Sequence, residues 1–75
     1  MFKFNEDDRF TLVNDSSKTG TIIRIARMDE FGTDLATWTF NYYVIKMDNN
    51  EIGPIHTVGG DIAEEKDMIK IVDDA

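Results

Sequence analysis

The run from Thr37 to Met47 constrains the fold most, because it is apolar on both faces of the β-strand that it predicts. Its large apolar side chains fall on both parities: Trp38, Phe40, Tyr42 and Val44 on one, and Tyr43, Ile45 and Met47 on the other. Successive side chains of a strand point to opposite faces of the sheet. This strand therefore needs cover on both sides, so it lies in the centre of a sheet or presents one face to a partner.

The chain has 75 residues and no cysteine, so disulfides cannot take the place of a hydrophobic core. A domain of this size buries only about 60% of the surface that its unfolded chain exposes, which leaves little room for a deep substrate cleft. The hydrophobic fraction of 41% favours a folded chain over a disordered acidic one. We expect one domain over residues 1–75, with residues 1–7 and 73–75 as flexible ends.

Four shorter runs of apolar and β-branched residues predict the remaining strands: Phe10 to Val13, Thr21 to Met28, Ile52 to Val58, and Met68 to Val72. The second of these runs places Thr21, Ile23 and Ile25 on one face. The segment from Asp48 to Glu51 predicts a hairpin turn, because Asn tolerates a positive φ. The order Asp61-Ile62-Ala63-Glu64 has the form of a capping box, which predicts one helical turn over Ile62 to Lys66.

Five short strands with one helical turn before the last predict an all-β fold, namely a small antiparallel barrel. Three segments carry a resemblance to a known group of barrels: Lys18-Thr19-Gly20-Thr21-Ile22, the run from Tyr43 to Glu51, and Gly60 to Glu64 followed by Ile69 to Val72. In this order they resemble the KOW and Tudor-like group of SH3-like barrels. The chain departs from that group at Asn50, where a Gly is usual, and in the long connection from Asp29 to Thr37. The resemblance implies binding to RNA or to ribosomal and transcription proteins.

Residues for catalysis are sparse. His56 is the only histidine, and the only serines, Ser16 and Ser17, lie in a segment rich in turn formers. A nucleophilic system needs a nucleophile, a base and an orienting group together, so we expect that the protein is not an enzyme. A catalytic alternative would depend on His56. The segment from Asp48 to Glu51 is too short for a calcium loop. We expect neither a metal nor a cofactor.

The formal net charge of −7 is unevenly distributed along the chain. A modest basic segment carries four cations that could contact nucleic acid: Arg9, Lys18, Arg24 and Arg27. The other interpretation is that these side chains are solvated and pair with nearby acids. Binding to nucleic acid depends on neutralising phosphates, which a negative chain opposes, so direct binding is the weaker expectation.

The acidic residues suggest a different partner, since a negative surface is attracted to the basic groove of a protein that handles nucleic acid. The candidates for such contacts are Asp29, Glu30, Asp34, Asp48, Glu51, Asp61, Glu64, Glu65 and Asp67. A small acidic chain without cysteine is similar in type to bacteriophage proteins that inhibit host enzymes by occupying such grooves. The alternative is that these acids only keep a small barrel soluble.

The aromatic face of Trp38, Phe40 and Tyr42 is either core or an interface, because aromatic residues dominate binding hot spots. A second copy of the chain, the segment from Asp29 to Thr37, or Phe2 and Phe4 could cover it. No apolar run of about 18 residues and no secretory signal is present, so we expect a cytoplasmic protein without membrane contact. The sequence thus predicts a non-catalytic module that binds a basic protein as an acidic inhibitor. The alternatives are a KOW-type adaptor and a structural or virion subunit.

Overall fold

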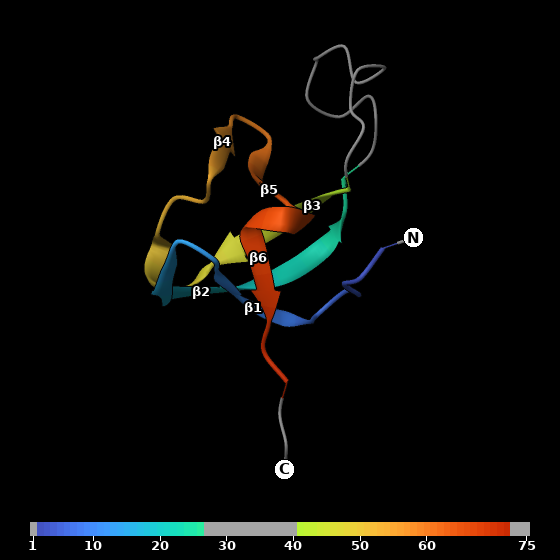
Figure 1. The fold of residues 1–75 in the computed structure, drawn as a ribbon. Helices are drawn as coiled ribbons and strands as arrows, with labels where there is room; N and C mark the ends of the chain where they lie inside the picture. The colour runs from blue at the N-terminus through green and yellow to red at the C-terminus, as the bar shows by residue number, and fades with distance from the viewer. Residues whose placement is uncertain (1, 27–40, 73–75) are drawn as a thin grey trace.

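A computed structural model describes residues 2–26 and 41–72 of the chain. Within these residues the fold is all-β, with six strands and two short 3-10 helices (Figure 1). The elements are β1 (Arg9–Leu12), β2 (Asp15–Ile25), β3 (Tyr42–Met47), η2 (Asp48–Asn50), β4 (Ile55–Thr57), β5 (Gly60–Glu64), η3 (Glu65–Asp67) and β6 (Met68–Lys70). No helix in the described ranges is both long enough and apolar enough to cross a membrane.

The six strands form one antiparallel sheet in the order β4-β5-β3-β2-β1-β6. Strand β3 has a paired neighbour on each side, which confirms a central position for the described part of the most apolar run. Strands β4 and β6 are the two edges of the described sheet, so it does not close into the expected barrel. The strand number also exceeds the expected five, because the predicted helical segment contributes β5.

The core lies on the face of β3 that carries Tyr43, Ile45 and Met47, as their shared parity predicted. Each of these side chains is at most 3% exposed. Side chains from five other parts of the chain pack against them: Phe4, Phe10, Ile22, Ala63 and Met68. On the opposite face of the sheet, Val44 and Ile62 are also buried and sit directly across from one another. Strand β3 is therefore covered on both faces.

The second strand does not keep Thr21, Ile23 and Ile25 on one face, as the sequence predicted. Thr21 pairs with Lys46 and Ile25 pairs with Tyr43, and these two partners lie on opposite faces of β3. Ile22 is 1% exposed and joins the core, whereas Ile23 is 46% and Ile25 42% exposed. The register of β2 against β3 shifts between Ile22 and Arg24, which marks a bulge. A bulge inserts an extra residue into one strand and breaks its strict alternation. A period-two pattern in the sequence cannot reveal that insertion.

The turn after β3 has the expected backbone, since Asn49 and Asn50 have φ values of 60° and 57°. The strand that follows does not return along β3, however, because β4 pairs with β5. The connection is held instead by the Asp61 carboxylate, whose Oδ2 accepts the Gly53 N–H at 3.0 Å. The expected two-stranded hairpin of β3 and the next strand is therefore wrong.

The capping-box prediction at Asp61 to Glu64 was also wrong, because these residues belong to β5. Ile62 and Ala63 are buried and face Val44 and Tyr43 of β3. Burial against the central strand outweighs a local capping preference. A helical turn does precede the last strand as expected, but it is the 3-10 turn η3, directly after β5.

Candidate functional site

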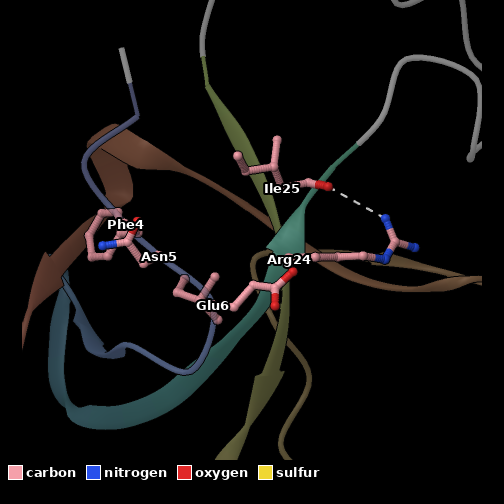
Figure 2. A pocket seen from close by; sticks show the side chains of 6 residues that line it. Phe4, Asn5, Glu6, Arg24 and Ile25 are labelled. Atoms are coloured by element: carbon pink, nitrogen blue, oxygen red, sulfur yellow. Dashed lines mark hydrogen bonds between the residues drawn. The ribbon is translucent and has the colours of Figure 1, made fainter.

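A surface pocket of about 420 Å³ lies between the N-terminal segment and the end of β2 (Figure 2). Among the residues that the structure describes, its lining comes from these two stretches of chain: Phe4, Asn5 and Glu6, and Ile22, Arg24 and Ile25. Ligand sites are commonly apolar hollows with a few polar groups at defined positions. Apolar walls and two oppositely charged residues give this pocket that character.

Backbone hydrogen bonds hold the two walls of the pocket together at one end. The Asp7 N–H donates to the Ile22 carbonyl at 2.8 Å, and the Ile22 N–H donates to the Asp8 carbonyl at 2.9 Å. Asp7 has a φ of 70°, in the left-handed region, which lets the chain turn here. The N-terminal segment therefore lies against β2 as a fixed wall.

The other end of the N-terminal segment is anchored by Phe4, which is 3% exposed. Its ring packs edge-to-face on Tyr43 with ring centroids 5.3 Å apart, and its N–H donates to the Tyr43 hydroxyl at 3.3 Å. Phe2 makes a second edge-to-face contact with the same ring. The sequence identified Phe2 and Phe4 as possible cover for the Trp38 face, but Phe4 serves the main core.

Glu65 fastens the same segment from the side of η3. Its Oε2 accepts hydrogen bonds from the Tyr43 hydroxyl at 2.5 Å, from Asn41 Nδ2 at 3.1 Å and from the Lys3 N–H at 3.1 Å. Burial alone would raise the pKa of Glu65, but these hydrogen bonds outweigh it and lower the pKa. Burial, reinforced by the bond to Glu65, raises the pKa of Tyr43 to about 12. Glu65, a predicted contact residue, is thus part of the framework behind the pocket.

Arg9 and Asp48, which the sequence assigned to two rival surfaces, pair with each other. The Arg9 guanidinium contacts both carboxylate oxygens of Asp48, at 2.8 and 2.5 Å, and also donates to Thr21 Oγ1. The Thr19 hydroxyl donates to Asp48 at 2.5 Å. The guanidinium and the Thr19 hydroxyl hold the pKa of Asp48 well below its usual range. This ion pair joins β1 to η2 and supports the interpretation that Arg9 pairs with a nearby acid.

The other basic candidates do not gather into one patch. Lys18 and Arg24 lie toward opposite ends of β2, separated by about 20 Å at the usual rise per residue of a strand. The Arg24 Nη1 donates to the Ile25 carbonyl at 3.5 Å. Arg27 lies outside the described residues. The structure therefore shows no single cluster of these cations in the described part of the chain.

Most of the described acidic candidates form bonds within the fold. Asp61 bonds to Gly53 and His56, while the buried Glu64 accepts from the Tyr42 hydroxyl and pairs with Lys66 at 3.2 Å. Asp67 accepts the Val13 N–H through its backbone carbonyl, and Glu51 is exposed in the connection after η2. Asp48 follows the end of β3, whereas Glu64 pairs with Tyr42 at its beginning, so these two acids lie at opposite ends of the strand. The remaining candidates, Asp29, Glu30, Asp34, Trp38 and Phe40, lie outside the described residues.

His56 pairs with Asp61 across the β4–β5 hairpin, with 2.5 Å between His56 Nδ1 and Asp61 Oδ1. A histidine beside a carboxylate is part of a nucleophilic triad, but the described residues place no serine against this pair. The Ser17 hydroxyl instead donates to Asp15. Burial would raise the pKa of Asp61, but the bonds from His56 and Gly53 outweigh it and lower the pKa. The pair braces the hairpin.

Across the parts of the chain that the structure describes, no group of three or more His, Asp or Glu side chains could hold a metal ion. The comparisons with known proteins add no relative: no family model, no curated protein and no solved structure matches this chain.

The sequence analysis missed the pocket, because none of its six residues except Arg24 was a candidate for binding. Phe2 and Phe4 alternate with polar residues, and this alternation was the available signal. Glu6 was hidden among fifteen acids, and Ile22 and Ile25 looked like ordinary strand residues. Only the packing of the N-terminal segment against β2 brings these residues together.

Proposed function

We propose that this protein is a non-catalytic binding module, of SH3-like architecture, for a basic protein partner that itself handles nucleic acid. In this function the chain is an acidic inhibitor or modulator, of the type that bacteriophages encode, acting in the cytoplasm of the host. The six-stranded antiparallel sheet is compatible with an open SH3-like arrangement. The proposal makes the partner's nucleic-acid surface, rather than nucleic acid, the binding site.

The ion pairs of the described residues carry this proposal. Arg9, Lys66 and Lys70 pair with Asp48, Glu64 and Asp8 respectively. These contacts use basic side chains inside the fold, while the whole chain keeps a net charge of −7. A strongly negative protein is steered toward positive surfaces and away from phosphates. The pairing of Arg9 also removes one of the four cations on which a KOW-type adaptor depends.

Exposed apolar side chains give this proposal a second kind of support. Ile69 on β6, together with Ile71 and Val72 directly after it, is more than 40% exposed. Neighbouring exposed apolar groups at a sheet edge are available for contact with a protein. They suit a protein interface better than a phosphate backbone.

A capture experiment tests the proposal. The chain is fixed on beads and mixed with a bacterial lysate, and the bound proteins are then exposed to salt or to duplex DNA. We expect basic proteins to be retained, and to be released both by added salt and by duplex DNA that competes for the same surface. In parallel, the anisotropy of labelled single-stranded and duplex oligonucleotides should not change when the chain is added.

Two results would contradict the proposal. Direct binding of an oligonucleotide at moderate salt, lost on Arg24→Ala with Arg27→Ala, would replace it with the KOW-type adaptor. Retained proteins that neither salt nor DNA releases would favour a structural subunit.

Charge changes at Asp61, Glu64 or Glu65 are unsuitable as tests of the acidic surface, because those side chains support the fold. Glu51→Gln is the better variant, since this residue is exposed in a connection.

A further inference from the structure

The pocket between the N-terminal segment and β2 has walls that suit a long aliphatic stem. Phe4 and Ile22 are almost completely buried and present the inner part of the hollow, while Ile25 is half-exposed at its edge. Lysine and arginine bury the methylene groups of their side chains along apolar surfaces and keep the charged end in water. A volume of about 420 Å³ admits such a side chain with part of its backbone.

The charged side chains at the pocket determine which sign of charge its ligand should carry. Glu6 is exposed and has no hydrogen bond or ion pair within residues 2–26 and 41–72. Figure 2 shows the Glu6 side chain extending from the N-terminal segment toward β2, and the Arg24 guanidinium pointing away from it toward the Ile25 carbonyl. The carboxylate is therefore the charged group aimed at the hollow, and Arg24 contributes its aliphatic part.

The pocket is formed before any ligand arrives. Asp7 and Asp8 bond to Ile22 at one end of the wall, and Lys3 and Phe4 bond to Glu65 and Tyr43 at the other. A wall fixed at both ends loses little conformational freedom on binding, which favours affinity. A mobile terminal segment would not provide such a wall.

We infer that this pocket receives a lysine or arginine side chain of the partner, with the stem on Phe4, Ile22 and Ile25 and the cation on Glu6. The inference rests on the proposed function, because it assigns the contact point for the basic partner. It places that contact at residues outside the acidic set that the sequence suggested.

A peptide titration followed by NMR tests the inference on the full chain. The probe is the blocked tripeptide acetyl-Gly-Lys-Gly-amide, and the matched control peptide carries norleucine, which has the apolar stem without the charge. We expect the lysine peptide to shift the signals of Glu6, Ile22 and Ile25 at millimolar concentration. The Glu6→Gln variant should weaken binding by about two- to fivefold, the range for an exposed ion pair. Asp15→Asn removes an equal charge at the end of β2 that lies away from the pocket, and it should leave the affinity unchanged.

Three outcomes would overturn the pocket assignment. The norleucine peptide could bind as tightly as the lysine peptide, which would mean an apolar site without charge selection. Glu6→Gln and Asp15→Asn could weaken binding equally, which would mean diffuse attraction to a negative chain. The shifts could also fall outside the pocket. In the last two cases DNA-sensitive capture of basic proteins would still stand, so failure of the pocket and failure of the proposed function are distinguishable.

Discussion

At the scale of single residues, the space between neighbouring strands restricts a position more than the chemical type of its side chain does. Gly20 lies opposite Phe10 in the pairing of β1 and β2, and opposite Met47 in the pairing of β2 and β3. A Cβ atom at Gly20 would lie 2.7 Å from Phe10 Cζ and 2.8 Å from the Lys46 carbonyl oxygen. Phe10 is fully buried, so its ring has little room to move. A strand interior normally disfavours glycine, and here the packing requires it.

Replacing Gly20 with Ala should therefore destabilise the fold. We expect the free energy of unfolding in urea to fall by about 1–3 kcal/mol, the usual cost of overpacking a core. Ser16→Ala, at an exposed position of the same strand, is the control and should change stability by less than about 0.5 kcal/mol. Equal stability of the Gly20→Ala variant and the unchanged chain would show that Phe10 and β3 can shift to accommodate the added methyl group.

The Tyr43 hydroxyl is the second decisive residue-scale group, because it bonds to Glu65 and to the Phe4 N–H. Tyr43→Phe should lower the free energy of unfolding by about 1–3 kcal/mol, since it leaves the buried Phe4 N–H without a partner and removes one of the hydrogen bonds to Glu65. Hydrogen exchange at the Phe4 amide should quicken. Tyr42→Phe, which removes one bond of a half-buried hydroxyl, should cost less. A larger loss in Tyr42→Phe would contradict the role given to Tyr43.

The same hydroxyl predicts a dependence on alkaline pH. The pKa of Tyr43 is raised from 10.0 to about 12, so folding favours the neutral phenol. Its contribution to stability is complete below pH 10 and is lost as the pH rises toward 12. Unfolding in urea across this range should show a decline that is smaller in Tyr43→Phe. An identical decline in both chains would assign the effect to other groups.

At the scale of elements, side chains rather than regular turns connect the strands. The Arg9–Asp48 pair joins β1 to η2, and Asp61 joins β5 to β4 and to the Gly53 backbone. The two Asp61 contacts help to hold β4 beside β5, and β5 in turn pairs with β3. Short edge strands of three residues have few backbone bonds, so such braces matter more for them than for β2 or β3.

Asp61→Asn should loosen the β4–β5 hairpin selectively. It removes the charge that pairs with His56, and we expect a loss of about 1 kcal/mol at neutral pH, the typical net value of one hydrogen bond. The pKa of Asp61 is lowered in the fold, so its contribution is present above the ordinary value of 3.8 and is lost as the pH falls below it. The difference between the two chains should therefore shrink in acid, as measured by urea unfolding.

The control for this prediction is Asp15→Asn, in the turn before β2, where the carboxylate bonds only to nearby Ser17. It should leave hydrogen exchange in the β4–β5 hairpin unchanged. A uniform change in exchange across the sheet in Asp61→Asn would refute a local brace.

At the scale of the whole molecule, the net charge of −7 on so small a chain disfavours the compact state. Each of the three described ion pairs of Lys or Arg has at least one exposed partner, and such pairs contribute little to stability. Screening of these pairs by salt therefore removes little of the free energy of unfolding. Relief of the general repulsion should dominate. The same excess charge is what attracts a basic partner.

Sodium chloride should consequently stabilise the protein. We expect the free energy of unfolding at neutral pH to rise by about 1 kcal/mol between low and moderate salt, as screening shortens the range of repulsion. The control is the same series near pH 4.4, the isoelectric point, where the rise should disappear. A fall in stability with salt at neutral pH would mean that local ion pairs outweigh the repulsion.

The sequence by itself determined the all-β class, the central position of the run around Tyr43 and Ile45, and the inward parity of that run. These follow from local composition and alternation, which act within one strand. It also predicted the positive φ at Asn49, which is a property of one residue and its turn.

Only the tertiary structure decided the strand order, the bulge after Ile22 and the pocket at Glu6. A bulge and a side-chain brace depend on what lies across the sheet, and the Asp61 carboxylate reads as a helix cap until β3 is beside it. The pairing of Arg9 with Asp48 joins residues 39 positions apart, and it turned two expected binding residues into one internal contact. Contacts between distant segments have no local signature, because their energy exists only once the chain has folded.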